Sequence, residues 1–210
     1  QELVKDWREE VAPRVNSDAV PIIPERLCNE LTHALPDNAI LVADTGHAGI
    51  WTGSMVELNH PSQSYIRCAG SLGWGLPGAM GVQCAEPDRP VICFTGDGGL
   101  WYHIGELDTA VRYNIPVVTV VNNNQGLLQN KRGDDRGYAN VEGADSAELW
   151  KFNDVDLAKV AESMGAFGIR VTQPGDIQSA IEQALASGRP AIVDVVTDPA
   201  DSESPVPWAP

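Results

Sequence analysis

Short apolar runs that each end in polar or glycine residues are the feature that most constrains the fold of this chain. The runs at 39–43, 90–95, 117–121 and 191–196 contain few polar residues. This pattern is typical of strands that are buried on both faces of a parallel sheet. A further strand is expected at 168–171.

Segments with helical periodicity separate these runs. Leu27, Leu31 and Leu35 recur every four residues before Pro36, and further helices are expected at 73–85, 107–115, 155–161 and 177–185. Strands that alternate with helices of this length form right-handed βαβ units. The sequence therefore predicts an α/β fold: a doubly wound, mostly parallel six-stranded sheet with helices on both faces.

Three parts are expected along the chain. Residues 1–20 are polar and unpatterned, which is typical of a linker from a preceding domain or arm. Residues 21–197 form the domain, and 198–210 form an acidic, Pro-rich tail, for which Trp208 indicates a docking site somewhere. Within the domain, 125–150 is a connection with few apolar residues, and connections of this length are usually functional.

Composition excludes several classes of partner. The net charge is −15 at pH 7, and the longest apolar run, 117–121, is far too short for a membrane span. An acidic surface repels nucleic acid backbones and anionic lipids, so neither nucleic acid nor a membrane is expected as a partner. The four cysteines show no metal-ligand spacing, which favours a reducing, cytoplasmic location.

Polar segments follow three of the expected strands, at 44–47, 96–99 and 122–124. In a parallel sheet these strand ends meet at one edge, where ligands bind. Glycines allow backbone N–H groups to approach an anion, while Asp97 and Asn124 carry the oxygen ligands that Mg²⁺ prefers. Each segment alone is also compatible with a simple turn or strand end, but together they predict a metal-bridged diphosphate site.

These residues resemble a known signature. Gly96-Asp97-Gly98 followed by Asn123-Asn124 is similar to the thiamine-diphosphate (ThDP) motif of the acetolactate synthase and 2-oxo acid decarboxylase superfamily. The segments at 70–81, 106–110, 115–117 and 188–195 resemble further parts of its diphosphate-binding (PP) domain. The resemblance spans 20–197 and implies the ThDP-binding fold, with ThDP and Mg²⁺ as cofactors.

The resemblance also implies site residues. Mg²⁺ would be bound by Asp97, Asn124 and the carbonyl of Gly126. Leu72 would hold the cofactor in its bent form; alternatively, it only packs at the start of a helix. His47 would either contact the cofactor or cap its own loop. Leu127 and Leu128 would either line the pocket or pack in the core. The remaining cofactor contacts would come from Gly46, Ala48, Gly70, Ser71, Gly96, Gly98 and Gly99.

The family's catalytic glutamate is not implied for any residue of this chain. That glutamate belongs to a pyrimidine-binding (PYR) domain, which the resemblance does not cover, and the loop at 125–128 is shorter than in many acetolactate synthases. We therefore expect activity only with a PYR domain supplied by another chain or segment. A Gly- and Ala-rich segment at 75–81 indicates close contact with another domain or subunit, in a hetero- or homo-oligomer, as a dimer or tetramer.

The implied reaction is decarboxylation of a small 2-oxo acid followed by transfer of the resulting enamine to a carbonyl acceptor, as in acetolactate synthase. One alternative is a two-subunit decarboxylase that releases an aldehyde, similar to sulfopyruvate decarboxylase. Another is a non-catalytic structural subunit. A nucleotide-binding Rossmann protein is disfavoured because no G-x-G-x-x-G follows the first strand.

Overall fold

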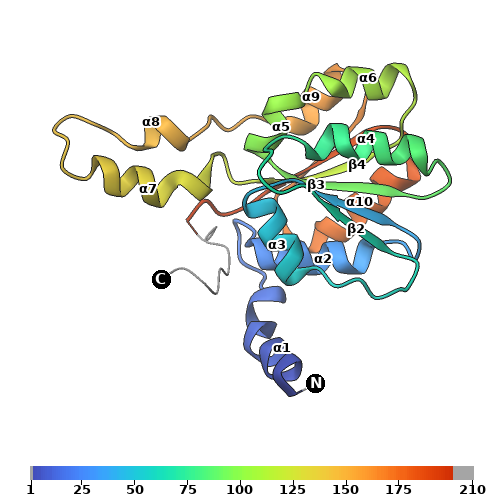
Figure 1. The fold of residues 1–210 in the computed structure, drawn as a ribbon, viewed down its shortest axis with the longest axis horizontal. Helices are drawn as coiled ribbons and strands as arrows, with labels where there is room; N and C mark the ends of the chain where they lie inside the picture. The colour runs from blue at the N-terminus through green and yellow to red at the C-terminus, as the bar shows by residue number, and fades with distance from the viewer. Residues whose placement is uncertain (1, 201–210) are drawn as a thin grey trace.

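A computed structural model of the chain describes residues 2–200, apart from the side chain of Arg132. Six strands form a single sheet with the order β2-β1-β3-β4-β6-β5, and every neighbouring pair is parallel (Figure 1). The strands are β1 (Ile40–Ala43), β2 (Ser64–Arg67), β3 (Val91–Gly96), β4 (Val118–Asn123), β5 (Phe167–Val171) and β6 (Ala191–Val196). The predicted α/β fold and six-stranded sheet are confirmed, and the sheet is entirely parallel.

Helices cover both faces of the sheet. One face packs against α2 (Pro24–Ala34), α3 (His47–Met55) and α10 (Ile177–Ala186), and the other against α4 (Gly75–Ala85), α5 (Asp97–His103), α6 (Glu106–Arg112) and α9 (Leu157–Ser163) (Figure 1). A short 3-10 helix, η1 (Pro174–Asp176), precedes α10. β1, β3, β4 and β6 are almost completely buried between these layers, which explains their apolar sequences.

Several of the described elements were not expected from the sequence, among them helix α3, since no helix was predicted at 47–55. Residues 2–15 are not unpatterned but form helix α1 (Glu2–Val15), which packs on the domain through Trp7 and Val11. None of its residues is fully buried. The edge strand β2 is only half buried, with side chains that are alternately covered and exposed.

The connection at 125–150 contains two further helices, α7 (Leu128–Tyr138) and α8 (Ala147–Trp150), which extend away from the body of the domain (Figure 1). Its two ends are tied together beside the sheet, because Leu127 N–H donates to the Trp150 carbonyl (2.7 Å) and Phe152 N–H donates to the Gln125 carbonyl (2.7 Å). The projection therefore starts and finishes at the carboxyl end of β4.

Most of the remaining boundaries follow the expected pattern. The single helix expected at 107–115 is preceded by a separate helix, α5, which begins at Asp97. The predicted docking of Trp208 falls outside the described residues. Among residues 2–200, no helix has the length and apolar character needed to cross a membrane.

Candidate functional site

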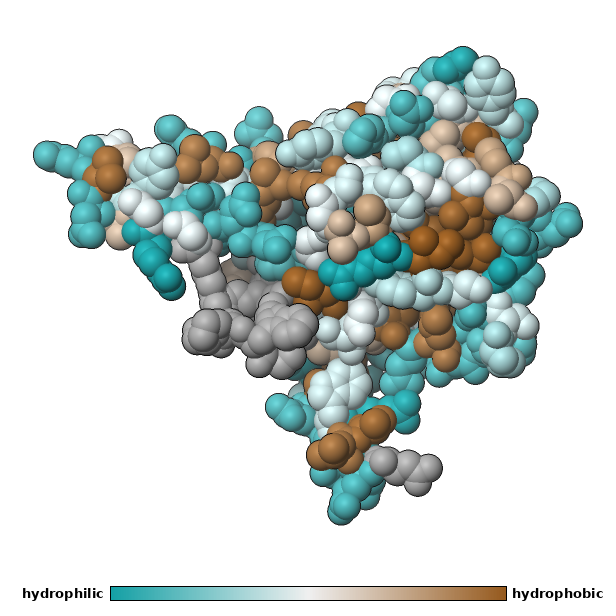
Figure 2. All heavy atoms as spheres, in the orientation of Figure 1, coloured by the Kyte–Doolittle hydropathy of each residue, from teal (hydrophilic) through white to brown (hydrophobic). Residues whose placement is uncertain are grey.

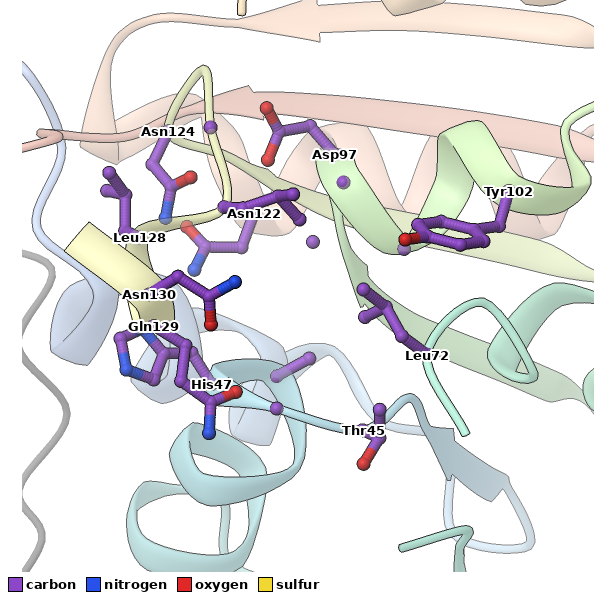
Figure 3. A pocket seen from close by; sticks show the side chains of 17 residues that line it. Thr45, His47, Leu72, Asp97, Tyr102, Asn122, Asn124, Leu128, Gln129 and Asn130 are labelled. Carbon is purple, nitrogen blue, oxygen red and sulfur yellow. The ribbon is translucent and has the colours of Figure 1, made fainter. Parts of the chain in front are cut away.

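A pocket opens at the carboxyl ends of β1, β3 and β4, where the predicted segments meet (Figure 3). Of the fourteen residues predicted for the cofactor site, twelve line this pocket: Gly46, His47, Ala48, Leu72, Gly96, Asp97, Gly98, Gly99, Asn124, Gly126, Leu127 and Leu128. Gly70 and Ser71 are exposed and do not line it. The structure thus brings the predicted segments together, and their individual roles remain predictions.

The Asp97 carboxylate, the Asn124 amide and the Gly126 carbonyl converge on one side of the pocket. One end of the Asn124 amide lies 3.3 Å from Asp97 Oδ1 and 3.1 Å from the Gly126 carbonyl oxygen. With its nitrogen at this end the amide donates to both oxygens, and with its oxygen at this end three oxygen atoms meet. Three oxygen ligands at such separations also match adjacent ligands of an octahedral Mg²⁺ ion, so this donor set fits the metal that the resemblance implies.

Asp97 is strongly affected by its surroundings. Asp97 is the first residue of helix α5, and the residue is only 3% exposed. Burial raises the pKa of Asp97 to about 7; hydrogen bonds from the Gly98 and Gly126 backbone oppose this rise, and the negative charge of Asp194 adds to it. A cation beside the carboxylate would favour its charged form and reverse this shift.

The two glycines after Asp97 are required by close packing. A Cβ atom at Gly98 would lie 2.5 Å from the Leu127 side chain, and one at Gly99 would lie 2.7 Å from Thr95 Oγ1. Any larger residue would push into the pocket wall or displace these neighbours. The absence of side chains at this point brings the main chain of α5 directly to the pocket wall.

A second buried carboxylate, Asp44, supports the pocket from behind. Its Oδ1 accepts hydrogen bonds from the backbone N–H groups of Thr45 (2.7 Å) and Gly73 (3.0 Å), and its Oδ2 accepts one from Thr95 Oγ1 (2.9 Å). Gly73 adjoins Leu72, so Asp44 fixes the segment that carries Leu72 to the ends of β1 and β3. The sequence alone indicates no supporting role for Asp44 beyond its place in the segment after the first strand.

Residues from β6 hold the end of β4 in place. Asp194 accepts hydrogen bonds from Asn123 Nδ2 (2.8 Å) and from Leu157 N–H (3.0 Å), and the Arg170 guanidinium lies 3.3 Å away. Asn123 Oδ1 in turn accepts from Gln125 N–H (3.3 Å). This chain of contacts fixes the loop that carries Asn124 and Gly126.

The loop after β1 forms the opposite wall. Gly46 has a positive φ of 72°, which a residue with a side chain rarely adopts, and it is the N-cap residue that directly precedes α3. A Cβ atom at Gly46 would lie 2.8 Å from Gln129 Oε1, so the first turn of α7 closes against this loop. His47 is half buried and lines the pocket.

Gly70 lies beside the pocket. It has a φ of 82°, and its N–H donates to Thr45 Oγ1 (2.9 Å). Gly70 and Ser71 are both exposed, so their predicted cofactor contacts would have to form on the open side of the site.

Five lining residues were not identified from the sequence: Thr45, Tyr102, Asn122, Gln129 and Asn130. Thr45 and Asn122 belong to segments that were recognised, but neither was assigned a role. Gln129 and Asn130 lie at the start of α7, which the sequence pattern did not predict as a helix.

Comparisons with known proteins agree with this geometry. Residues 44–195 match the family described as "Thiamine pyrophosphate enzyme, C-terminal TPP binding domain"; thiamine pyrophosphate is another name for ThDP. The chain is 32% identical over 210 residues to a putative thiamine pyrophosphate-containing protein, YdaP, of Bacillus subtilis, covering 98% of this chain and 34% of that protein.

Two further relatives carry enzyme names. A probable acetolactate synthase large subunit of Methanococcus aeolicus is 31% identical over 230 residues, covering 99% of this chain and 36% of the relative. A glyoxylate carboligase of Escherichia coli O157:H7 is 34% identical over 197 residues, covering 88% of this chain and 33% of the relative. The chain therefore spans about a third of the length of the curated relatives it matches.

Proposed function

This chain belongs to the thiamine pyrophosphate enzymes, as a C-terminal TPP-binding domain, and we propose that it holds the diphosphate end of ThDP through Mg²⁺ in an enzyme that acts on 2-oxo acids. The convergence of the Asp97 carboxylate, the Asn124 amide and the Gly126 carbonyl carries this proposal. Two of these three residues were predicted as side-chain ligands from their spacing and strand ends alone.

Electrostatics supports a metal-bridged arrangement over a direct one. A diphosphate placed beside the Asp97 carboxylate would be repelled in a chain whose net charge is already −15. Mg²⁺ between the carboxylate and the phosphate oxygens converts this repulsion into attraction, with Asn124 and Gly126 as neutral oxygen ligands. The N–H groups of Gly98 and Gly99, and of the loop 46–48, would then contact the remaining phosphate oxygens.

When bound, ThDP supplies a nucleophilic carbon that adds to the carbonyl of a 2-oxo acid and accepts the electron pair released with CO₂. The residues of this chain would bind and orient. Leu72, held in place through Gly73 and Asp44, would support the cofactor from one side. Leu127 and Leu128 line the same pocket and would exclude water from the reacting end.

Carboligation is the reaction that the relatives favour. The names of the acetolactate synthase and glyoxylate carboligase relatives both refer to joining reactions. We therefore propose that the fragment left after decarboxylation is transferred to a carbonyl acceptor rather than released as an aldehyde. Release of an aldehyde and a non-catalytic role are the two alternatives that the assay below separates.

A PYR domain is the proposed partner. The relatives are about three times as long as this chain, which leaves room in them for further domains. We propose that the glutamate that activates the cofactor comes from such a domain, on another chain or segment, within a dimer or tetramer.

The experiment combines binding and turnover. The purified protein, with any chain that co-purifies, is titrated with ThDP in Mg²⁺ and then assayed with pyruvate or glyoxylate. CO₂ release with formation of an acetohydroxy acid or another joined product supports a carboligase. CO₂ release with free aldehyde identifies a decarboxylase, and cofactor binding with no turnover by the complete assembly identifies a structural subunit.

A further inference from the structure

Asn122 is a buried amide with one half of its hydrogen-bonding capacity unused. The residue is 2% exposed and lines the pocket. Its Oδ1 accepts a hydrogen bond from Thr197 Oγ1 (2.6 Å), and Thr197 is itself 1% exposed. This contact fixes the orientation of the amide, so the position of its nitrogen is set as well.

The Asn122 nitrogen is directed into the pocket. Figure 3 shows it pointing away from Asn124 and toward the part of the pocket where Asn130 and Gln129 lie. Within residues 2–200, the hydrogen bond to Thr197 is the one that the structure records for the Asn122 side chain. The two N–H bonds of this amide are therefore available to a ligand.

The adjacent asparagines show that this is unusual. Asn123 uses both ends of its amide, with Asp194 and with Gln125, and Asn124 faces Asp97 and Gly126. The Asn122 nitrogen, by contrast, is open to the pocket that the residue lines, so an acceptor on a bound ligand could complete its hydrogen bonding.

We infer that Asn122 is a further ligand-binding residue, whose amide nitrogen donates to a phosphate oxygen at the floor of the pocket, and that Thr197 positions it. An amide N–H requires an acceptor, and Asp97, the one carboxylate among residues 2–200 that lines the pocket, would be occupied by the metal. Phosphate oxygens are the acceptors that the surrounding glycine N–H groups also suit. The inference rests on the proposed function, because it assumes that a diphosphate occupies this pocket.

Binding of inorganic pyrophosphate and of ThDP, each with Mg²⁺, tests the inference by titration calorimetry on the purified protein. Asn122→Leu removes the donor at nearly constant volume. It is expected to lower the affinity for both ligands about 10–100-fold, which is the effect of losing a hydrogen bond to a charged group. Asn122→Asp places a repelling oxygen at the same position and is expected to weaken them further. Thr197→Val keeps the donor but releases its orientation, with an expected loss of about 3–10-fold.

Thr119→Val is the matched control. Thr119 is buried on the same strand but does not line the pocket. The affinity of Thr119→Val for both ligands is therefore expected to stay within about twofold of that of the unmodified protein. The melting temperature without ligand is recorded for every variant, because a purely structural role of Asn122 would lower it without changing the affinity of the folded fraction.

The outcomes separate the two levels of the argument. Pyrophosphate binding by the unmodified protein, with the expected order of losses, supports the inference. Affinities of Asn122→Leu and Thr197→Val that stay within twofold overturn it and leave the proposed function intact. No binding of either ligand by the unmodified protein overturns the proposed function and this inference together.

Discussion

Asp44 and Asp97 are two carboxylates buried at the ends of neighbouring strands, with exposed fractions of 1% and 3%, yet their surroundings differ. Asp44 is enclosed by donors inside the protein: two backbone N–H groups and the Thr95 hydroxyl. Asp97 accepts hydrogen bonds from the Gly98 and Gly126 backbone but also lines the pocket, where the Asn124 amide lies 3.3 Å from its Oδ1. Asp44 thus has its partners within the fold, whereas Asp97 faces a space that a cation could occupy.

This difference separates scaffold from site. A buried carboxylate with all its partners inside the protein contributes to folding and orients what it holds, here the segment next to Leu72. A buried carboxylate that faces a pocket, such as Asp97, is destabilised in its charged form because burial outweighs its backbone hydrogen bonds, and a cation bound beside it would reverse this effect. The four predictions below test this division, beginning with the largest expected effect.

Removing the Asp97 carboxylate is expected to affect binding most. Asp97→Ala should abolish Mg²⁺-dependent ThDP binding, a loss of more than about 100-fold, because a charged metal ligand is lost. Calorimetry measures this, with Asp88→Ala, an exposed acidic residue outside the pocket, as the control. Unchanged affinity in Asp97→Ala would contradict the metal assignment.

Asp44 is expected to show the reverse behaviour. Asp44→Ala leaves the Thr45 and Gly73 N–H groups and the Thr95 hydroxyl without their acceptor. We expect a loss of about 3 kcal/mol in the free energy of unfolding, or roughly 6–12 °C in melting temperature. Thermal denaturation without ligand measures it. A shift of less than 2 °C would mean that Asp44 does not have the structural role described here.

The pH dependence of stability sharpens the contrast. Because burial raises the pKa of Asp97 to about 7, the folded protein without metal binds more protons than the unfolded chain between about pH 4 and 7. The free energy of unfolding should therefore fall as pH rises through this range, by about 2–3 kcal/mol between pH 5 and 8. Asp97→Asn should remove this part of the slope, and Mg²⁺ with pyrophosphate should reduce it.

Denaturant titrations at several pH values measure the slope. The comparison is made between the unmodified protein and Asp97→Asn, since other groups titrate in both proteins alike. Identical slopes would show that the Asp97 carboxylate is not destabilised by burial.

The smallest effect is expected at Leu72, which Asp44 positions indirectly. Leu72 is half buried, so Leu72→Ala should change the melting temperature little and leave the affinity for Mg²⁺-pyrophosphate unchanged. Turnover of the assembled enzyme should fall about tenfold, because the support for the cofactor is lost. An equal loss of pyrophosphate affinity would show that Leu72 acts on the diphosphate end instead.

The fold could be predicted where burial determines the sequence. β1, β3, β4 and β6 are enclosed on both faces and carry continuous apolar runs, so they were identified together with the helices between them. β2 is an edge strand of four residues with alternating exposure, and its short segment has no comparable signal. Helix α1 packs through Trp7 and Val11, and α7 is polar apart from Leu128 and Tyr138 at its ends, so neither shows an apolar stripe long enough to indicate a helix.

The candidate site was predictable to the extent that it follows the strand ends. Asp97 and Asn124 were paired because parallel strands bring their ends to one edge. The support of this pair by Asp194 through Asn123, and the packing of Gln129 against Gly46, depend on contacts between distant segments that no local pattern encodes. Figure 2 shows a further feature that the sequence pattern does not indicate: apolar residues gather at the surface between α4 and β2.

Binding of ThDP by the unmodified protein with and without Mg²⁺ tests the central claim most directly. Titration calorimetry in excess Mg²⁺ is compared with the same titration in a chelating buffer. We predict one saturable site per chain in Mg²⁺ and no detectable binding in chelator. Equal binding in both buffers would show that the Asp97, Asn124 and Gly126 oxygens do not hold a metal, and no binding in either would contradict the cofactor site itself.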